Sequence, residues 1–196
     1  MKRLIHTLTL LLLVAPAGAL HAQGIGWTLT PKVGFFTPLT SLSETADSES
    51  KLATALALGL SLEIDFRATP LAVRANADIA TNSEVESADG STLAADQLNL
   101  VGDLLYRPFS RNYIVQPYLL AGAGLKRYSL SDDEFDISTS DQMFTAHVGA
   151  GVIFDFGSVK LSAELSDYIS SWESSATESK GQHDIFGMVG LRIPLN

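Results

Sequence analysis

The sequence predicts an all-β protein, an eight-stranded antiparallel up-and-down transmembrane β-barrel. Apolar and polar residues alternate along eight separate segments, and the connections between those segments are alternately long and short. Because a strand sends successive side chains to opposite faces, this alternation predicts strands with one apolar and one polar face. A length of 196 residues suits one domain, and a hydrophobic content of 46% excludes global disorder.

The clearest of the eight expected strands covers residues 52–66. All but one of its even positions are apolar, whereas its odd positions are small at one end and acidic at the other. A helix would bring Glu63 and Asp65 into the same stripe as the leucines, so the strand is favoured. The other expected strands cover residues 27–35, 73–79, 98–107, 118–126, 144–156, 159–166 and 184–195.

The connections place short turns at one end of the barrel and long loops at the other. The long loops are expected at residues 41–50, 81–96, 131–141 and 170–183, and the short turns at 68–70, 108–112 and 157–158. The long loops are rich in Ser, Thr, Asp and Glu, whereas Arg67, Arg107 and Arg111 gather at the short-turn end. This layout is typical of barrels in bacterial outer membranes.

Charged residues of the expected strands share the polar face, which we assign to the barrel interior. An unpaired Lys or Arg facing lipid at mid-bilayer costs roughly 2–4 kcal/mol. Eight strands enclose a lumen that side chains can fill, so we expect paired charges instead of an open pore. The expected lumen network comprises Lys32, Glu63, Asp65, Arg74, Asp78, Asp103, Lys126, His147, Asp155, Lys160, Glu164 and Arg192.

Aromatic residues near the strand ends are expected to form two girdles at the membrane surfaces. The girdle at the short-turn end would contain Trp27, Phe66, Tyr106, Phe154 and Phe156, and the opposite girdle Phe35, Phe144, Tyr168 and Trp172.

The first 22 residues have the three-part layout of a secretory signal peptide. A basic start, Lys2-Arg3, precedes a short leucine-rich run and then small residues. Cleavage is expected after Ala22, with Ala19 as the alternative, which leaves residues 23–196 as the barrel domain. The formal net charge of −9 disfavours nucleic acid as a partner, and the lack of cysteine excludes disulfides and thiol chemistry.

Three segments resemble the small outer-membrane β-barrel family of the OmpA/OmpX type. They are PYLLAGAGL at 117–125, HVGAGVIFDFG at 147–157 and HDIFGMVGLRIPL at 183–195. The resemblance implies a monomer in the outer membrane that contacts lipid and lipopolysaccharide and is inserted by the barrel-assembly machinery. No periplasmic domain is expected after the barrel. The chain departs from the family pattern at its end, where Leu195-Asn196 replaces a terminal aromatic residue.

Other patterns offer weaker candidates for chemistry. His147 and His183 could act as bases in a lipid A-modifying enzyme, but neither has an evident nucleophilic serine beside it. Asp132, Glu134 and Asp136 are spaced like calcium ligands but lack the turn glycine and distal glutamate of an EF-hand. We therefore expect no catalytic, cofactor or metal site. Paired glycines such as Gly149 and Gly151 are expected to make room for bulky lumen side chains.

The function expected from these patterns is non-enzymatic. Such a barrel would maintain the envelope or present acidic loops for surface interaction. The leading alternative is a small pore, because many lumen positions are Ala, Gly or Ser. A lipid A-modifying enzyme and a soluble ligand-binding barrel are the further alternatives.

Overall fold

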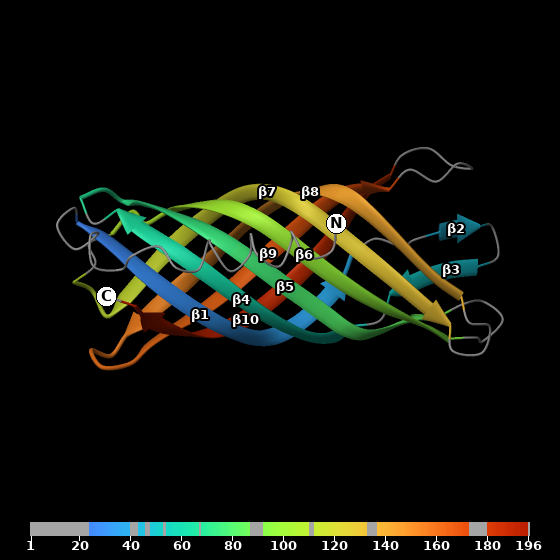
Figure 1. The fold of residues 1–196 in the computed structure, drawn as a ribbon, viewed down its shortest axis with the longest axis horizontal. Helices are drawn as coiled ribbons and strands as arrows, with labels where there is room; N and C mark the ends of the chain where they lie inside the picture. Colours follow the sequence, from blue (N-terminus) through green and yellow to red (C-terminus); the bar gives the residue numbers. More distant parts are fainter. Residues whose placement is uncertain are drawn as a thin grey trace, which may run out of the picture.

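Eight long antiparallel strands form a closed barrel in the computed structural model (Figure 1). The structure describes residues 24–39, 43–45, 48–52, 54–66, 68–86, 92–109, 112–132, 137–172 and 180–195. The long strands are β1 (Ile25–Pro38), β4 (Ala55–Phe66), β5 (Leu71–Glu86), β6 (Thr92–Tyr106), β7 (Val115–Asp132), β8 (Ile137–Asp155), β9 (Lys160–Trp172) and β10 (Lys180–Pro194). The described residues contain no helix long and apolar enough to cross a membrane.

Each long strand pairs with the next along the chain, and β1 also pairs with β10. The closing register joins Thr28 to Pro194 at the short-turn end and Pro38 to Asp184 near the other end. This up-and-down closure leaves no open sheet edge around the barrel wall, which a strand structure in lipid requires. It confirms the predicted fold class.

The apolar faces of the strands point outward. On β4, Leu56, Leu58 and Leu60 are about half exposed, whereas Ala57 and Glu63 are buried inside. The same alternation continues around the wall, so leucine and valine side chains cover the outside. The barrel is thus inverted relative to a soluble protein, with its polar face in the centre.

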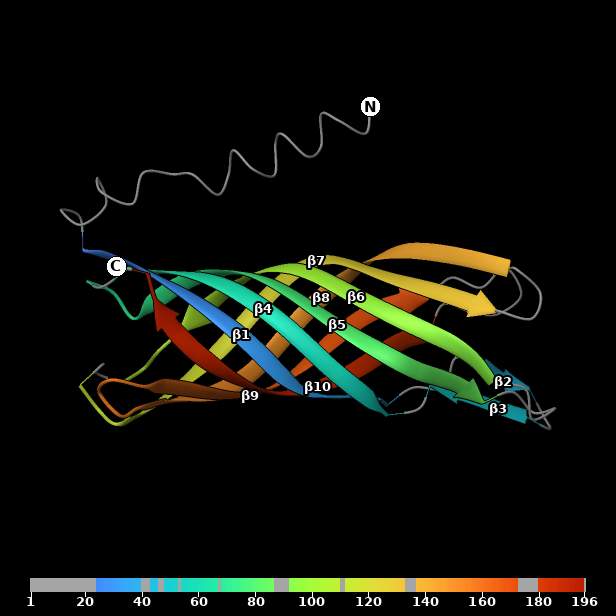
Figure 2. The ribbon, with the colours of Figure 1, turned by 60° about the horizontal axis from the view of Figure 1, so that its bottom comes forward.

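The strands extend further at the long-loop end than the sequence predicts. The loop expected at residues 131–141 is largely strand, because β7 runs to Asp132 and β8 begins at Ile137. The first expected loop contains a short hairpin of β2 (Ser43–Thr45) and β3 (Ser48–Leu52), and β3 adds to β5 (Figure 2). Beyond the apolar belt, both faces of a strand are in contact with water. The alternation of apolar and polar residues therefore ends there, although the backbone pairing continues. The hydrophobic pattern therefore marks the apolar belt and not the strand ends.

A tight hairpin joins β8 to β9 at the short-turn end, as Gly157-Ser158 predicts. Gly157 has a φ of 83°, a left-handed conformation that glycine adopts at no steric cost. Phe156 donates its backbone N–H to the Val159 carbonyl over 2.9 Å, and the Gly157 N–H reaches Asp155 Oδ1 over 2.9 Å.

Most of the described girdle aromatics face outward. Phe66, Tyr106 and Phe156 are exposed at the short-turn end, and Phe35 and Phe144 are exposed towards the other end. The prediction for Tyr168 was wrong, because this residue is completely buried inside the barrel. A tyrosine has an apolar ring and a polar hydroxyl, so it suits the girdle at the membrane surface as well as the lumen. The side chain of Trp172 lies outside the described residues.

The outward face can be tested by placing a charge on it at two depths. Leu60 lies in the middle of β4, and Leu56 lies near its long-loop end. Leu60→Arg is expected to lower the free energy of unfolding by about 2–4 kcal/mol, and Leu56→Arg by about 0–1 kcal/mol, because the cost falls towards the membrane surface. Urea unfolding of the barrel in phospholipid vesicles measures both. Equal losses at the two depths would contradict the lipid-facing assignment.

Candidate functional site in the barrel lumen

The structure gathers most of the expected lumen network in the barrel interior. Nine of its twelve members are at most 8% exposed: Lys32, Glu63, Arg74, Asp78, Asp103, Lys126, His147, Glu164 and Arg192. Asp65 lies beside them and is partly buried. Asp155 and Lys160 pair with each other over 2.6 Å at the short-turn end, where both are partly exposed. These two are therefore part of the mouth and not of the buried network.

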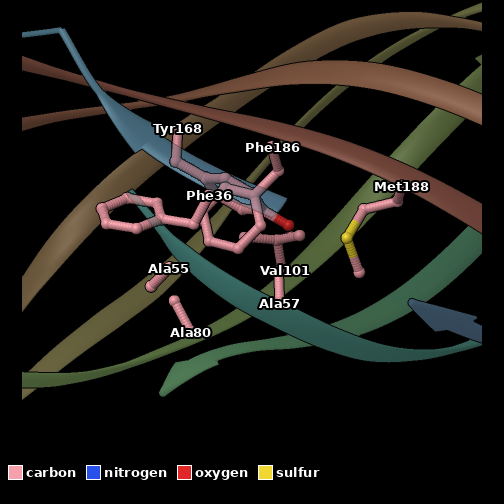
Figure 3. Packing of buried hydrophobic residues seen from close by; sticks show 8 residues of the cluster. All are labelled: Phe36, Ala55, Ala57, Ala80, Val101, Tyr168, Phe186 and Met188. Atoms are coloured by element: carbon pink, nitrogen blue, oxygen red, sulfur yellow. The ribbon is translucent and has the colours of Figure 1, made fainter. Parts of the chain in front are cut away.

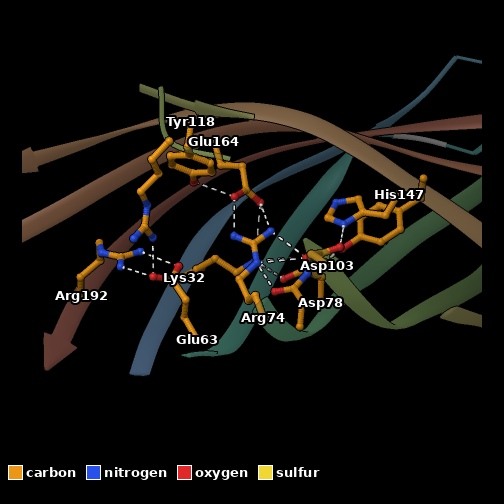
Figure 4. A network of polar contacts seen from close by, with 12 residues as sticks. Lys32, Glu63, Arg74, Asp78, Asp103, Tyr118, His147, Glu164 and Arg192 are labelled. Carbon is orange, nitrogen blue, oxygen red and sulfur yellow. Dashed lines mark hydrogen bonds and ion pairs between the residues drawn. The ribbon is translucent and has the colours of Figure 1, made fainter. Parts of the chain in front are cut away.

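Arg74 forms the centre of the network (Figure 4). Its Nε and Nη2 donate to Asp103 Oδ2 over 3.0 and 2.9 Å, and its Nη1 donates to Glu164 Oε2 over 2.6 Å. Tyr118 donates its hydroxyl to the same Glu164 oxygen over 2.7 Å. Arg74 lies on β5 and Glu164 on β9, four strands apart in a ring of eight, so this contact spans the lumen between opposite walls.

A second group of contacts surrounds Asp78. Lys32 Nζ lies 2.9 Å from Asp78 Oδ1 and donates to Asn76 Oδ1 over 2.7 Å. Tyr168 donates its hydroxyl to Asp78 Oδ2 over 2.6 Å, again from β9 to β5 across the barrel. Asn76 and Tyr168 were not predicted as members, although both share the inward parity of their charged neighbours.

His147 is held inside this network. Its Nδ1 lies 2.7 Å from Asp103 Oδ1, and its ring stacks on Tyr168 with centroids 4.1 Å apart. Its Nε2 has no hydrogen-bond partner among the described residues, so no serine or threonine hydroxyl there is activated by it. His147 is thus part of the lumen packing, between Asp103 and Tyr168.

The prediction that His183 lies in a loop was wrong. His183 belongs to β10, and its Nδ1 lies 2.7 Å from Asp167 Oδ2 on β9. Asp167 is on the opposite face of β9 from the buried Ser166 and Tyr168. Strand charges are therefore not confined to the lumen face.

Two further ion-pair groups lie towards the ends of the lumen. Glu63 pairs with Arg107 and with Arg192, whose Nη2 is 2.7 Å from Glu63 Oε1. Arg107, expected only at the rim, is 4% exposed and also binds Asp65 over 2.8 Å. Arg107 is four residues after Asp103, so a continued strand directs both side chains inward, and this spacing could have predicted the buried position. Arg67 and Arg111, expected beside it, lie outside the described residues.

Towards the long-loop end, Lys126 pairs with Asp184. Both side chains are completely buried, and Lys126 Nζ also donates to Ser170 Oγ over 3.3 Å. Asp184 was not predicted as a member of the network, although it shares the inward parity of Arg192 on the last strand.

An apolar cluster accompanies the charges, which the sequence did not predict. Phe36, Tyr168 and Phe186 pack with ring centroids 5.2 Å apart for the two phenylalanines and 5.0 Å apart for Tyr168 and Phe186 (Figure 3). Five smaller residues complete this aromatic cluster: Ala55, Ala57, Ala80, Val101 and Met188. The lumen is thus filled by hydrophobic as well as ionic contacts.

Inward glycines separate the members of three polar pairs. In strand register, Gly59 lies between Lys32 and Asp78, Gly122 between Asp103 and His147, and Gly151 between Tyr118 and Glu164. A Cβ at Gly122 would lie 2.3 Å from Asp103 Oδ1, and one at Gly151 would lie 2.4 Å from the Tyr118 ring. The missing side chain lets residues two strands apart touch, in agreement with the role expected for Gly151.

No group of three or more His, Asp or Glu residues suited to a metal ion occurs within the described residues. Asp132 ends β7, whereas Glu134 and Asp136 of the expected acidic triplet lie outside the described residues.

Comparison with solved structures supports the same architecture. The similar structures include Neisserial surface protein A (14% identity, 85% of this chain and 96% of that chain, TM-score 0.64). A major outer membrane protein from Thermus thermophilus is also similar (12% identity, 87% and 99%, TM-score 0.56). So is the E. coli outer membrane protein W (12% identity, 86% and 98%, TM-score 0.50). At these identities the likeness establishes the fold alone.

Sequence comparison supplies the family. A search among curated proteins gives no match. The family model described as outer membrane protein beta-barrel domain matches residues 7–179, which is most of the chain. With the closed barrel and its apolar exterior, this match places the protein in the outer membrane. The chain belongs to the outer membrane protein beta-barrel domain family.

Proposed function

We propose that this protein is a closed, non-conducting outer-membrane barrel that presents acidic segments at its long-loop end for surface interaction. The observation that carries the proposal is the set of contacts between opposite walls of the lumen. Arg74 reaches Glu164, and Tyr168 reaches Asp78, each from strands four apart in the ring. Such contacts can form only where side chains bridge the whole lumen.

Further buried contacts fill the lumen at several heights along the axis. Glu63 with its two arginines lies nearest the short-turn end, and the Arg74 group follows. The aromatic cluster and the Lys126–Asp184 pair lie further along. An ion would have to break buried salt bridges to pass, and removing a partner from such a pair is strongly unfavourable. This supports a structural role over the alternative of a pore.

The long-loop end supports a role at the cell surface. Strands β5 to β8 continue beyond the apolar belt, and the β2–β3 hairpin extends the sheet there. The sequence between 131 and 141 contains five acidic and no basic residues. We propose that these segments face the exterior and meet lipopolysaccharide and external partners, and that the barrel is a monomer without nucleic-acid partners.

The remaining parts of the proposal concern export and chemistry. Residues 1–22 act as a signal peptide, after which the barrel-assembly machinery inserts the chain; their basic, apolar and small-residue layout supports this. The barrel is not an enzyme, a view supported by the placement of His147 against Asp103 and Tyr168.

Conductance in planar bilayers tests the closed lumen. The purified wild-type barrel is expected to give no reproducible current steps. The double variant Arg74→Ala/Glu164→Ala removes a wall-to-wall bridge at one height and is expected to give brief, infrequent steps at most, because the Glu63 and Lys126–Asp184 pairs still close the lumen. Leu60→Ala, on the outer face, is the matched control and is expected to stay silent. Heat-modifiable gel mobility verifies that each variant is folded. Regular steps from the wild type would overturn the proposal and favour the pore.

The glycine rows that permit the lumen contacts can be tested separately. Gly122→Ala is expected to lower the free energy of unfolding by about 1–3 kcal/mol, because the new Cβ meets Asp103 and the neighbouring backbone. Gly102→Ala is the control on the adjacent strand, where an added Cβ meets nothing within 4 Å. Its stability should be unchanged or slightly raised. Urea unfolding in vesicles distinguishes the two; a harmless Gly122→Ala would refute the steric argument.

A further inference from the structure

A cavity of about 370 Å³ opens into the short-turn end of the barrel. Its lining comes from the ends of strands around the ring and includes Trp27, Asp65, Arg107, Ile153, Lys160 and Arg192. Three of these residues are basic and one is acidic. The volume lies within the range of sites for small organic ligands.

The basic residues retain unused hydrogen-bond donors at this cavity. A guanidinium has five N–H groups. Arg107 uses Nη1 on Asp65 and Nη2 on Glu63, while its Nε is buried without a partner among the described residues. Arg192 uses its two terminal nitrogens on Glu63, and Lys160 binds only Asp155 among the described residues. The mouth therefore offers more donors than its carboxylates accept.

Two of the three carboxylates that balance these cations lie outside the cavity lining, whereas the third, Asp65, is part of it and pairs with Arg107. Glu63 is 1% exposed and lies behind the two arginines, and Asp155 is not among the lining residues. The face turned to the cavity is therefore richer in positive groups than the mouth as a whole. Arg107 and Arg192 are fixed by Glu63, so a ligand would meet donors already held in place.

The remaining lining is mixed. The apolar Ile153 and Pro194 lie beside the polar Thr28 and Gln116, and Trp27 is at the rim. Cationic donors next to an aliphatic surface suit a molecule that has both an anionic group and a carbon skeleton. The Glu63 cluster closes the inner end of the cavity, so access is from the short-turn side alone.

We propose that this mouth binds a small organic anion bearing a carboxylate or phosphate group. Arg107 and Arg192 supply guanidinium N–H groups that Glu63 and Asp65 do not use, Lys160 supplies an ammonium at the rim, and Ile153 packs against the carbon skeleton. The site is a dead end, which distinguishes it from the entrance of a channel. It requires only the short-turn mouth, so it stands whether or not the long loops have the role proposed above.

Trp27 provides a reporter for the test. The chain has two tryptophans, so Trp172→Phe leaves Trp27 as the single emitter. The refolded barrel in detergent micelles is titrated with citrate, glycerol phosphate, sulfate and chloride at constant ionic strength. Saturable changes in emission are expected for both organic anions, with at least tenfold weaker binding of sulfate. Identical, non-saturating responses to all four would show a water-filled mouth that senses only bulk salt, and would overturn the proposal.

Matched variants then locate the binding. Lys160→Gln, at the partly exposed rim, is expected to weaken citrate binding at least threefold. Arg107→Lys keeps the charge but removes Nε and the planar fork, and is expected to weaken it at least tenfold. Arg127→Gln removes an exposed charge near the other end of β7 and should change nothing. Unchanged affinity in both mouth variants would overturn the assignment, and gel mobility shows whether Arg107→Lys remains folded.

Discussion

Ionic contact between opposite walls is the constraint on which this barrel depends. Charges at mid-bilayer depth are costly in lipid, so in the middle of the strands they point inward, and once buried they need partners. A ring of eight strands is narrow enough for a side chain from one wall to reach the other. Arg74 meets that requirement by binding Asp103 beside it and Glu164 opposite it. The same geometry that satisfies the charges also fills the lumen.

The barrel interior mixes polar contacts with aromatic packing, which the core of a soluble protein keeps apart. Tyr168 takes part in both kinds of contact, since its ring contacts Phe186 and His147 while its hydroxyl binds Asp78. Buried salt bridges alone add little net stability, because desolvation offsets their attraction. The aromatic cluster adds apolar burial beside them. Inward glycines are what allow these long side chains to fit within so small a circumference.

The sequence predicts the strands and their outward side chains better than the contacts between side chains in the lumen. Alternation along residues 52–66 identifies β4 and its outward leucines, because the lipid imposes that pattern directly. Parity also places Lys32 and Glu164 inside. It cannot tell which inward groups meet, since that depends on register between strands distant in the chain. Phe186 and Tyr168 were missed because aromatic residues suit both the girdle and the lumen. Strand ends beyond the apolar belt carry no hydrophobic signal at all.

The seam between β1 and β10 has a consequence for biogenesis. Every other pairing in the wall joins neighbours in the chain, whereas this one joins Thr28 to Pro194. The cylinder therefore cannot close until β10 has been synthesised. Until β10 pairs with β1, the chain would expose two unpaired sheet edges and the apolar outer face to water. Such a chain must be shielded on its way to the membrane, and the pairing of β10 with β1 removes the exposed edges.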